Sequence, residues 1–221
     1  MKKLFKSFVI GAAALLCVSY GQESFAGEIT GGIRGIFTMN LGTKEQDMAE
    51  YKTLLGGGAA LYVNFGIGQM GSGMFGVQPE VCLYLHNGIE AKDKAAFNTK
   101  YKVTANSIDI PVLFTYTMPI SSIKLGFGVG PYISIPYGIE GEIEGIKILY
   151  GIDKLKFNRD GTPLGLAFDV NCGFNMGPGA LVIDIRYLWD IGKTAGKALG
   201  ESGSVFKRRS LAIGLGYEMK F

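Results

Sequence analysis

Residues 180–191 carry the sequence ALVIDIRYLWDI, and this stretch decides the fold class. One face of it holds Leu181, Ile183, Ile185, Tyr187 and Trp189, and the other holds Asp184, Arg186 and Asp190. A period of two residues indicates a β-strand, because successive side chains of a strand point to opposite faces. An apolar face backed by charges predicts a strand that separates an apolar phase from a polar one.

Seven further segments have the same period, and each pairs a strongly apolar face with a face of polar, charged or glycine residues. With the first segment they give eight predicted strands, at about 28–40, 54–68, 74–86, 104–117, 123–137, 163–176, 180–191 and 207–221.

The connections between these strands alternate in length. Three are tight turns, at residues 69–73, 118–122 and 176–179, whereas four are long and polar, at 41–53, 87–103, 138–162 and 192–206. An even number of strands with short turns at one end and long loops at the other is typical of outer-membrane barrels. The sequence therefore predicts an all-β fold, an eight-stranded antiparallel up-and-down transmembrane β-barrel in which odd strands run outward.

Composition agrees with this prediction. Of the 221 residues 48% are hydrophobic and the mean hydropathy is +0.23, yet no window holds the 18 or more apolar residues that a membrane helix needs. Glycine, at 34 residues, follows no triplet period, which excludes a collagen-like chain, and the aromatic content of 12% excludes disorder.

The N-terminus has the features of a cleaved secretory signal peptide at 1–26. Lys2, Lys3 and Lys6 precede an apolar stretch at 8–18, and a small-x-small site ends at Ala26. A lipoprotein signal at Cys17 is disfavoured because bulky Leu16 precedes it. We expect one barrel domain at 27–221, exported to the outer membrane of a Gram-negative-type envelope.

The mature chain has 221 − 26 = 195 residues, with 22 − 3 = 19 basic and 19 − 1 = 18 acidic side chains. This near balance provides no global field for nucleic-acid binding. Export to an oxidising compartment would permit a disulfide between Cys82 and Cys172. Their positions in the two-residue period, however, place Cys82 on the polar face and Cys172 on the apolar face, so we expect free thiols.

Aromatic residues of the apolar faces bunch at the strand ends, which predicts two girdles flanking an aliphatic band. They are Phe37, Tyr137, Tyr187 and Trp189 toward the outside, and Phe65, Phe75, Tyr116, Phe174, Tyr217 and Phe221 toward the inside. Pro79, Pro111 and Pro131 fit a closed barrel poorly because proline cannot donate to a ladder, so bulges or missing hydrogen bonds are expected there.

The polar faces place nine charged residues toward the lumen: Arg34, Glu80, Asp109, Lys124, Asp169, Asp184, Arg186, Glu218 and Lys220. Eight strands enclose little more than the volume of their side chains. We therefore expect a polar network that plugs the lumen, with a narrow ion path as the alternative.

Five stretches in order resemble the outer-membrane β-barrel family that includes the PorT-like proteins, an OmpX-like eight-stranded barrel domain. They are 76–80 with Leu83-Tyr84, 107–113, 126–132, 184–187 and 215–221. The family carries proline in the same local contexts as Pro79, Pro111 and Pro131. The resemblance implies no catalytic residues and no cofactor, although family members are often labelled porins. Tyr217, Met219 and the terminal Phe221 look like the signal that the barrel-assembly machinery binds.

Two other patterns leave alternatives open. His86, the single histidine, is expected near the outer rim on the lumen side, where lipid-modifying outer-membrane enzymes use a histidine with a serine and an acid. Ser107 faces inward on the neighbouring predicted strand, but its spacing suggests no triad, so we predict no enzymatic activity. Residues 138–150 of the third long loop also alternate, which suggests strands extending beyond the membrane. Glu140, Glu142 and Glu144 on one face of this segment could bind a cation, although a solvated acidic face is the simpler interpretation.

The expected partners are therefore membrane components. Basic residues close to the outer rim could hold lipopolysaccharide phosphates, namely Lys193, Lys197, Lys207, Arg208 and Arg209. We predict a monomer with a structural or surface-interaction role, whose long loops meet an unknown extracellular ligand. A lipid-modifying enzyme and an accessory protein of a secretion or small-solute pathway are the alternatives.

Overall fold

The structure is a computed structural model, and it describes residues 27–41, 49–93, 100–143, 146–150, 164–191 and 209–221. Ten strands lie in these ranges: β1 (Ile29–Asn40), β2 (Ala49–Thr53), β3 (Leu55–Met70), β4 (Gly73–Asp93), β5 (Lys100–Ile120), β6 (Ile123–Ile143), β7 (Ile146–Tyr150), β8 (Leu164–Met176), β9 (Gly179–Asp190) and β10 (Arg209–Lys220). In this described part of the chain there is no helix that is long and apolar enough to cross a membrane.

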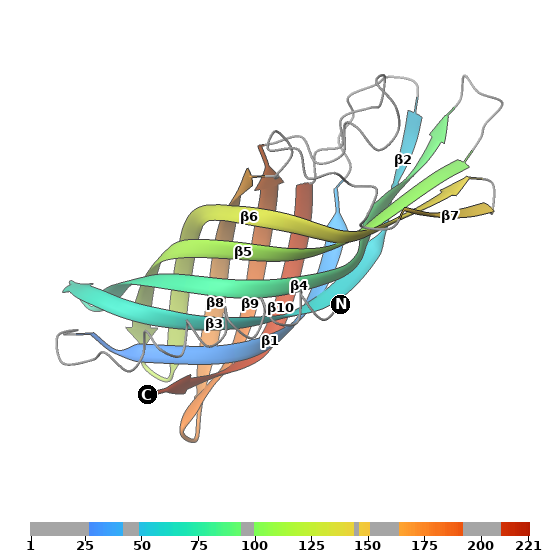
Figure 1. The fold of residues 1–221 in the computed structure, drawn as a ribbon. Helices are drawn as coiled ribbons and strands as arrows, with labels where there is room; N and C mark the ends of the chain where they lie inside the picture. The colour runs from blue at the N-terminus through green and yellow to red at the C-terminus, as the bar shows by residue number, and fades with distance from the viewer. Residues whose placement is uncertain (1–26, 42–48, 94–99, 144–145, 151–163, 192–208) are drawn as a thin grey trace, which may run out of the picture.

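Eight of the strands form a closed ring in the order β1, β3, β4, β5, β6, β8, β9, β10 (Figure 1). Every neighbouring pair is antiparallel, and β10 returns to pair with β1 from Thr30↔Lys220 to Asn40↔Ser210. Closure leaves the ring without a free edge, so each strand has hydrogen-bonding neighbours on both sides. The predicted eight-stranded antiparallel barrel is confirmed.

The short connections define one end of the barrel, which we call the inner end. Two-residue turns join β3 to β4, β5 to β6 and β8 to β9, and the C-terminus lies at this end as well (Figure 1). Gly71 has φ 63° and Gly177 has φ 61°, the left-handed conformation that tight hairpin turns require. The opposite end, which carries the long connections, is the outer end.

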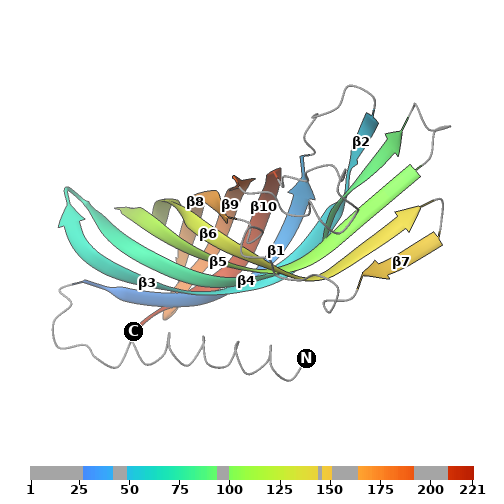
Figure 2. The ribbon, with the colours of Figure 1, turned by 45° about the horizontal axis from the view of Figure 1, so that its top comes forward.

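Three neighbouring strands continue past the outer end of the ring and form an extension with two short strands (Figures 1 and 2). β2 pairs with the far part of β4 from Ala49↔Asp93 to Thr53↔Ile89, and β7 pairs with the far part of β6. Residues 49–53, 87–93 and 100–103, predicted as loops, are therefore strand, whereas the strands that the alternation at 138–150 suggested beyond the membrane are present as the end of β6 and as β7. Outside an apolar phase a strand has no reason to alternate apolar and polar residues, so the pattern did not indicate the first three segments.

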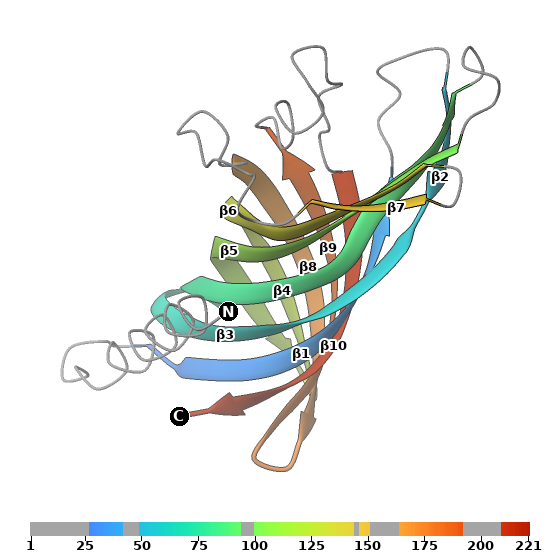
Figure 3. The same cartoon turned by 45° about the vertical axis from the view of Figure 1, so that its right-hand side comes forward.

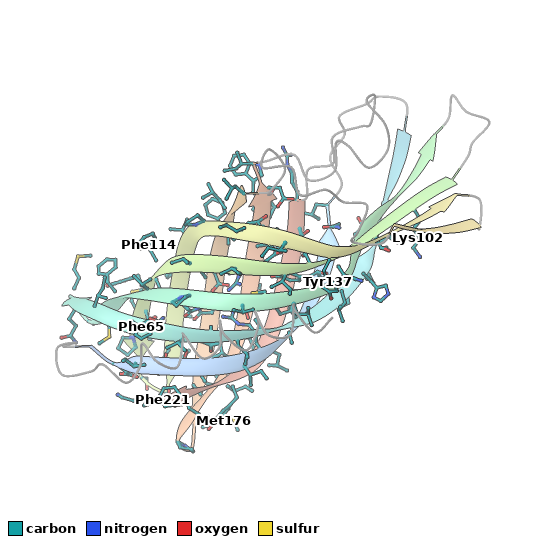
Figure 4. All side chains as sticks on the ribbon, in the orientation of Figure 1. Phe65, Lys102, Phe114, Tyr137, Met176 and Phe221 are labelled. Atoms are coloured by element: carbon teal, nitrogen blue, oxygen red, sulfur yellow. The ribbon has the colours of Figure 1, made fainter. Side chains whose placement is uncertain are left out.

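The two faces of the wall differ as the period of two requires. On β9, Ile183 and Ile185 are 41% and 51% exposed on the outer surface, whereas Asp184 and Arg186 between them are only 3% and 1% exposed in the lumen. Figure 4 shows side chains on both faces of the wall, with Phe114, which is 60% exposed, on the outside. The barrel is thus inverted relative to a soluble protein.

Irregular pairing occurs beside the prolines, but the bulges lie elsewhere. Between β4 and β5, two residue pairs are missing from the ladder after Pro79↔Val112, and pairing resumes at Cys82↔Asp109. Between β5 and β6, two pairs are missing after Pro111↔Tyr132, and pairing resumes at Phe114↔Val129. The register is the same on both sides of each interruption. The expectation of missing bonds is met and that of bulges is not. A missing N–H interrupts the ladder without requiring an extra residue.

A register shift between Tyr84 and Asn87 corrects the predicted position of His86. His86 has φ 55° and is exposed, and Asn87 takes the buried position that simple alternation assigns to His86. One additional residue in a strand reverses the direction of the next side chain, which a strict two-residue period cannot anticipate.

Cys82 and Cys172 are free thiols, as predicted. Cys82 is fully buried in the lumen, and Cys172 is half-buried in the outward phase of β8, between exposed Val170 and Phe174.

Candidate functional site: the barrel lumen

A contact between opposite walls crosses the middle of the lumen. Glu80 lies on β4 and Arg186 on β9, and these strands are four positions apart in the ring of eight, so they face each other across the axis. Arg186 Nη1 donates to Glu80 Oε2 at 2.6 Å and Nη2 donates to Glu80 Oε1 at 2.9 Å. Figure 3 shows β4 in front of β9 in this arrangement. A bidentate pair of this kind joins the two facing walls by two charge-assisted hydrogen bonds.

Three further charged residues complete what we call the plug, defined as Arg34, Glu80, Asp169, Asp184 and Arg186. Arg34 Nη2 donates to Glu80 Oε1 at 2.8 Å, and Arg34 Nη1 lies 2.9 Å from Asp184 Oδ1. Arg186 Nε donates to Asp169 Oδ1 at 2.9 Å. Each arginine therefore bridges Glu80 to an aspartate on another strand.

Neutral side chains hold the plug in position. Gln78 Nε2 donates to Glu80 Oε1 at 2.6 Å, and the Cys82 thiol lies 3.4 Å from Glu80 Oε2. The Arg34 guanidinium stacks 4.3 Å from the centroid of the Tyr62 ring, a cation–π contact. None of the five charged residues is more than 4% exposed, so each of them depends on its partners rather than on water.

An apolar layer lies one step farther toward the outer end. It consists of buried residues that face the lumen: Ile36, Ala60, Cys82, Tyr84, Leu113, Tyr132, Ala167, Leu188 and Ala212. The pattern of the polar faces did not predict this layer. Its members are scattered among charged neighbours, one or two to a strand, and they form a cluster only when the ring closes.

A second polar layer lies near the outer end. Ser134 Oγ donates to Asp109 Oδ1 at 2.5 Å, Tyr132 donates to Asp190, and Ser210 donates to Asn40. Asn40 Nδ2 in turn donates to the carbonyl of Gly88 at 2.9 Å. Asp109 thus lies in the lumen as predicted, and its partner Ser134 belongs to this layer.

The inner end of the lumen is hollow. A cavity of about 220 Å³ lies on the inner side of the plug and is lined by Glu28, Lys124 and Glu218 among others, with Arg34, Tyr62 and Gln78 also in its lining. Lys124 and Glu218 are partly exposed here, 29% and 15% for their side chains. Lys220, the last residue of β10, is 62% exposed and binds Glu28 at 2.7 Å. Lys220 therefore lies at the mouth of the barrel and not within its lumen, because the wall ends there.

Sequence reasoning did not select four polar residues that the structure brings into this assembly, namely Glu28, Tyr62, Asn64 and Gln78. Asn64 Nδ2 donates to Gln78 Oε1 at 3.0 Å and to Thr115 Oγ1 at 3.1 Å. All four are in phase with lumen-facing neighbours, so the two-residue period already placed them on the polar face. The predicted lumen network included charged residues only, so it left out the neutral residues Tyr62, Asn64 and Gln78.

The predicted assembly signal lies on the outer surface at the inner end. Met219 and Phe221 are 48% and 75% exposed, and Tyr217 donates to the carbonyl of Met176 at 3.0 Å. Phe221 also donates its backbone N–H to Ile29 at 2.9 Å, so the last residue still belongs to the wall. The Met219 and Phe221 side chains are therefore accessible in the folded barrel.

The rim histidine has no catalytic arrangement among the described residues. His86 is exposed, whereas Ser107 is 4% exposed in the lumen, so the two side chains lie on different faces of the wall. The described residues contain no group of three His, Cys, Asp or Glu side chains that could hold a metal ion. The side chains of Glu140, Glu142 and Glu144 lie outside the described residues, as do Lys193, Lys197, Lys207 and Arg208.

Comparisons with known proteins give a likeness of fold. No family model matches the chain, and no curated protein matches it in sequence. The outer membrane protein OprG from Pseudomonas aeruginosa has a TM-score of 0.50 at 15% identity, covering 89% of this chain and 98% of OprG. Neisserial surface protein A has a TM-score of 0.48 at 15% sequence identity, covering 87% of this chain and 97% of its own. Ail of Yersinia pestis, solved with the heparin analogue sucrose octasulfate, has a TM-score of 0.43 at 14% identity, covering 88% of this chain and 99% of its own. The likeness to OprG supports the fold alone, that of an eight-stranded outer-membrane barrel.

Proposed function

We propose that this protein is an integral outer-membrane barrel with a closed lumen, which acts through its outer end and not by catalysis or conduction. The plug supports this function more directly than any other feature. Its arginines connect opposite walls through buried hydrogen bonds, and a solute would have to break several of them in order to pass.

The outer surface supports a membrane location. Outward residues of β8 from Leu164 to Phe174 are apolar at every second position. Ten residue steps at a rise of about 3.3 Å, tilted by about 40°, span about 25 Å, which is the height of the apolar band of known outer-membrane barrels. With the signal sequence at 1–26, this band favours export and insertion over a soluble role.

The interaction surface would be the extension together with the long loops. β4, β5 and β6 continue well past the ring, which presents backbone and side chains beyond the apolar band (Figure 2). An extracellular ligand, and lipopolysaccharide at the rim, are the partners we propose for this end, with the barrel-assembly machinery as a partner during insertion. The resemblance to PorT-like proteins supports the same non-enzymatic role.

Conductance of single molecules tests the closed lumen. The purified protein, reconstituted into planar bilayers, should give no steady channel in 1 M KCl. The double variant Arg34→Ala with Arg186→Ala removes both bridging side chains and should conduct if it folds, because three acids then line an unfilled space. Arg209→Ala, an exposed arginine at the outer end, is the matched control and should stay silent. Steady currents through the unmodified protein would refute the proposal.

A further inference from the structure

The cavity at the inner end has the charges of a binding site for a small molecule. Its lining includes two acids, Glu28 and Glu218, and two bases, Lys124 and Arg34, together with hydroxyl and amide side chains. The plug is at its far side and the inner end of the barrel at its mouth. Any ligand would therefore enter from the side on which the short turns lie.

One donor in the lining is held only loosely by the contacts around it. Lys124 Nζ lies 3.6 Å from Glu218 Oε1 and 3.8 Å from Glu28 Oε1, both beyond the usual length of a hydrogen bond. Its three N–H groups are therefore available to an acceptor placed between them. The Lys124 side chain is 29% exposed, so a ligand in the cavity can reach it.

The neighbouring carboxylates restrict the class of ligand. Glu218 receives a hydrogen bond from Tyr62 at 3.3 Å, and Glu28 pairs with Lys220, so each keeps oxygen lone pairs for a second donor. A simple anion at Lys124 would be repelled by both acids, and a simple cation would be repelled by Lys124. A molecule with a carboxylate and an ammonium close together satisfies both sets of groups.

We propose that the inner cavity binds a small zwitterion of the α-amino acid class, with its carboxylate on Lys124 and its ammonium on Glu218 or Glu28. The volume of about 220 Å³ supports this size, since it is below the range of about 300–1,000 Å³ for drug-sized ligands and equals the space of about seven waters. The inference goes beyond the function proposed above, and it holds whether or not the barrel conducts.

Calorimetric titration of the folded barrel in detergent tests the site, with glycine as the probe. Glycine should bind saturably, whereas acetate and methylammonium, which each carry one of its charges, should bind at least tenfold more weakly. Diglycine has its charges farther apart and should also be weaker. This comparison distinguishes a free amino acid from a short peptide as the ligand.

Two variants and a control identify the residues. Lys124→Met should weaken glycine binding at least tenfold, and Glu218→Gln provides a second test should the first variant fail to fold. Lys102→Met, at an exposed lysine of β5, should bind glycine as the unmodified protein does. Absence of saturable binding, equal affinity for acetate and glycine, or unchanged binding by both variants would overturn the proposal and indicate a cavity that holds only water.

Discussion

Arg186 shows how one side chain can join two walls of a barrel. It is 1% exposed and donates to Glu80 on the facing strand and to Asp169 on the adjacent strand. Buried charges of this kind stabilise a fold only while every partner is present, because desolvation has already removed the alternative of water. The arrangement is therefore sensitive to the loss of a single partner.

Replacement of Arg186 by alanine should lower the free energy of unfolding by about 3 kcal/mol or more, since Glu80 and Asp169 would lose charged hydrogen bonds in a dry surrounding. Urea unfolding of the barrel in lipid vesicles measures the change. Arg209→Ala, at an exposed site, should cost less than about 1 kcal/mol. A loss of under 1 kcal/mol for Arg186→Ala would mean that the lumen is wet and the charges are screened.

The two thiols should differ in reactivity as they differ in burial. With the folded barrel in detergent, a small maleimide should label half-buried Cys172 faster than Cys82, which is 0% exposed and should react only after unfolding. Mass spectrometry of the intact protein should also show two reduced cysteines. An intramolecular disulfide would contradict the register of β4 or β8, because a slip of one residue exchanges the faces of a strand.

At the scale of elements, tyrosines secure the inner hairpins. Tyr116 on β5 donates to the carbonyl of Met70 at 3.1 Å, beside the turn from β3 to β4, and stacks on Phe75 at 4.7 Å between ring centroids. Tyr217 on β10 makes the equivalent bond to Met176 beside the turn from β8 to β9. In each case a glycine, Gly73 or Gly179, lies under the tyrosine ring and leaves space for it.

Gly73→Ala should therefore destabilise the barrel by about 1–3 kcal/mol, because the added methyl group would overlap the Tyr116 ring. Gly68→Ala is the matched control, since a Cβ at Gly68 would meet no atom within 4 Å. Vesicle unfolding of both variants, and of Gly73→Ala combined with Tyr116→Ala, gives a double-mutant cycle. If the two costs simply add, the ring and the glycine are not coupled and this explanation fails.

At the scale of the whole molecule, closure of the ring makes the barrel a single cooperative unit. Each of the eight strands contacts two neighbours, and the plug ties together strands that are not neighbours. Local opening would expose unpaired backbone groups to an apolar phase, which is costly. The barrel should consequently resist denaturation until the entire ring opens.

This cooperativity predicts a mobility that changes on heating. In dodecyl sulfate at room temperature the folded protein should migrate differently from a boiled sample, because the barrel stays closed and binds less detergent. The Arg34→Ala, Arg186→Ala double variant should lose the folded band at a lower temperature than the unmodified protein. Identical migration before and after boiling, together with recovery in the periplasmic fraction, would refute the membrane barrel.

Eight strands, their faces and the inward position of most charged residues could be predicted from the sequence, because the direction of a strand side chain depends only on its neighbours along the chain. Residues 180–191 show this alternation over their whole length. The pattern failed at His86, where one additional residue reverses the phase, and at residues 87–93 of the extension, where no apolar surrounding imposes alternation. It did indicate the strands at 138–150.

The tertiary structure alone decided which lumen residues meet. Glu80 and Arg186 are 106 positions apart, and they face each other only because of the stagger with which eight strands close into a ring. The same closure placed Lys220 at the mouth and left the cavity beside Lys124 open. Alternation is a local property of the chain, whereas a contact across the lumen depends on all eight strands together.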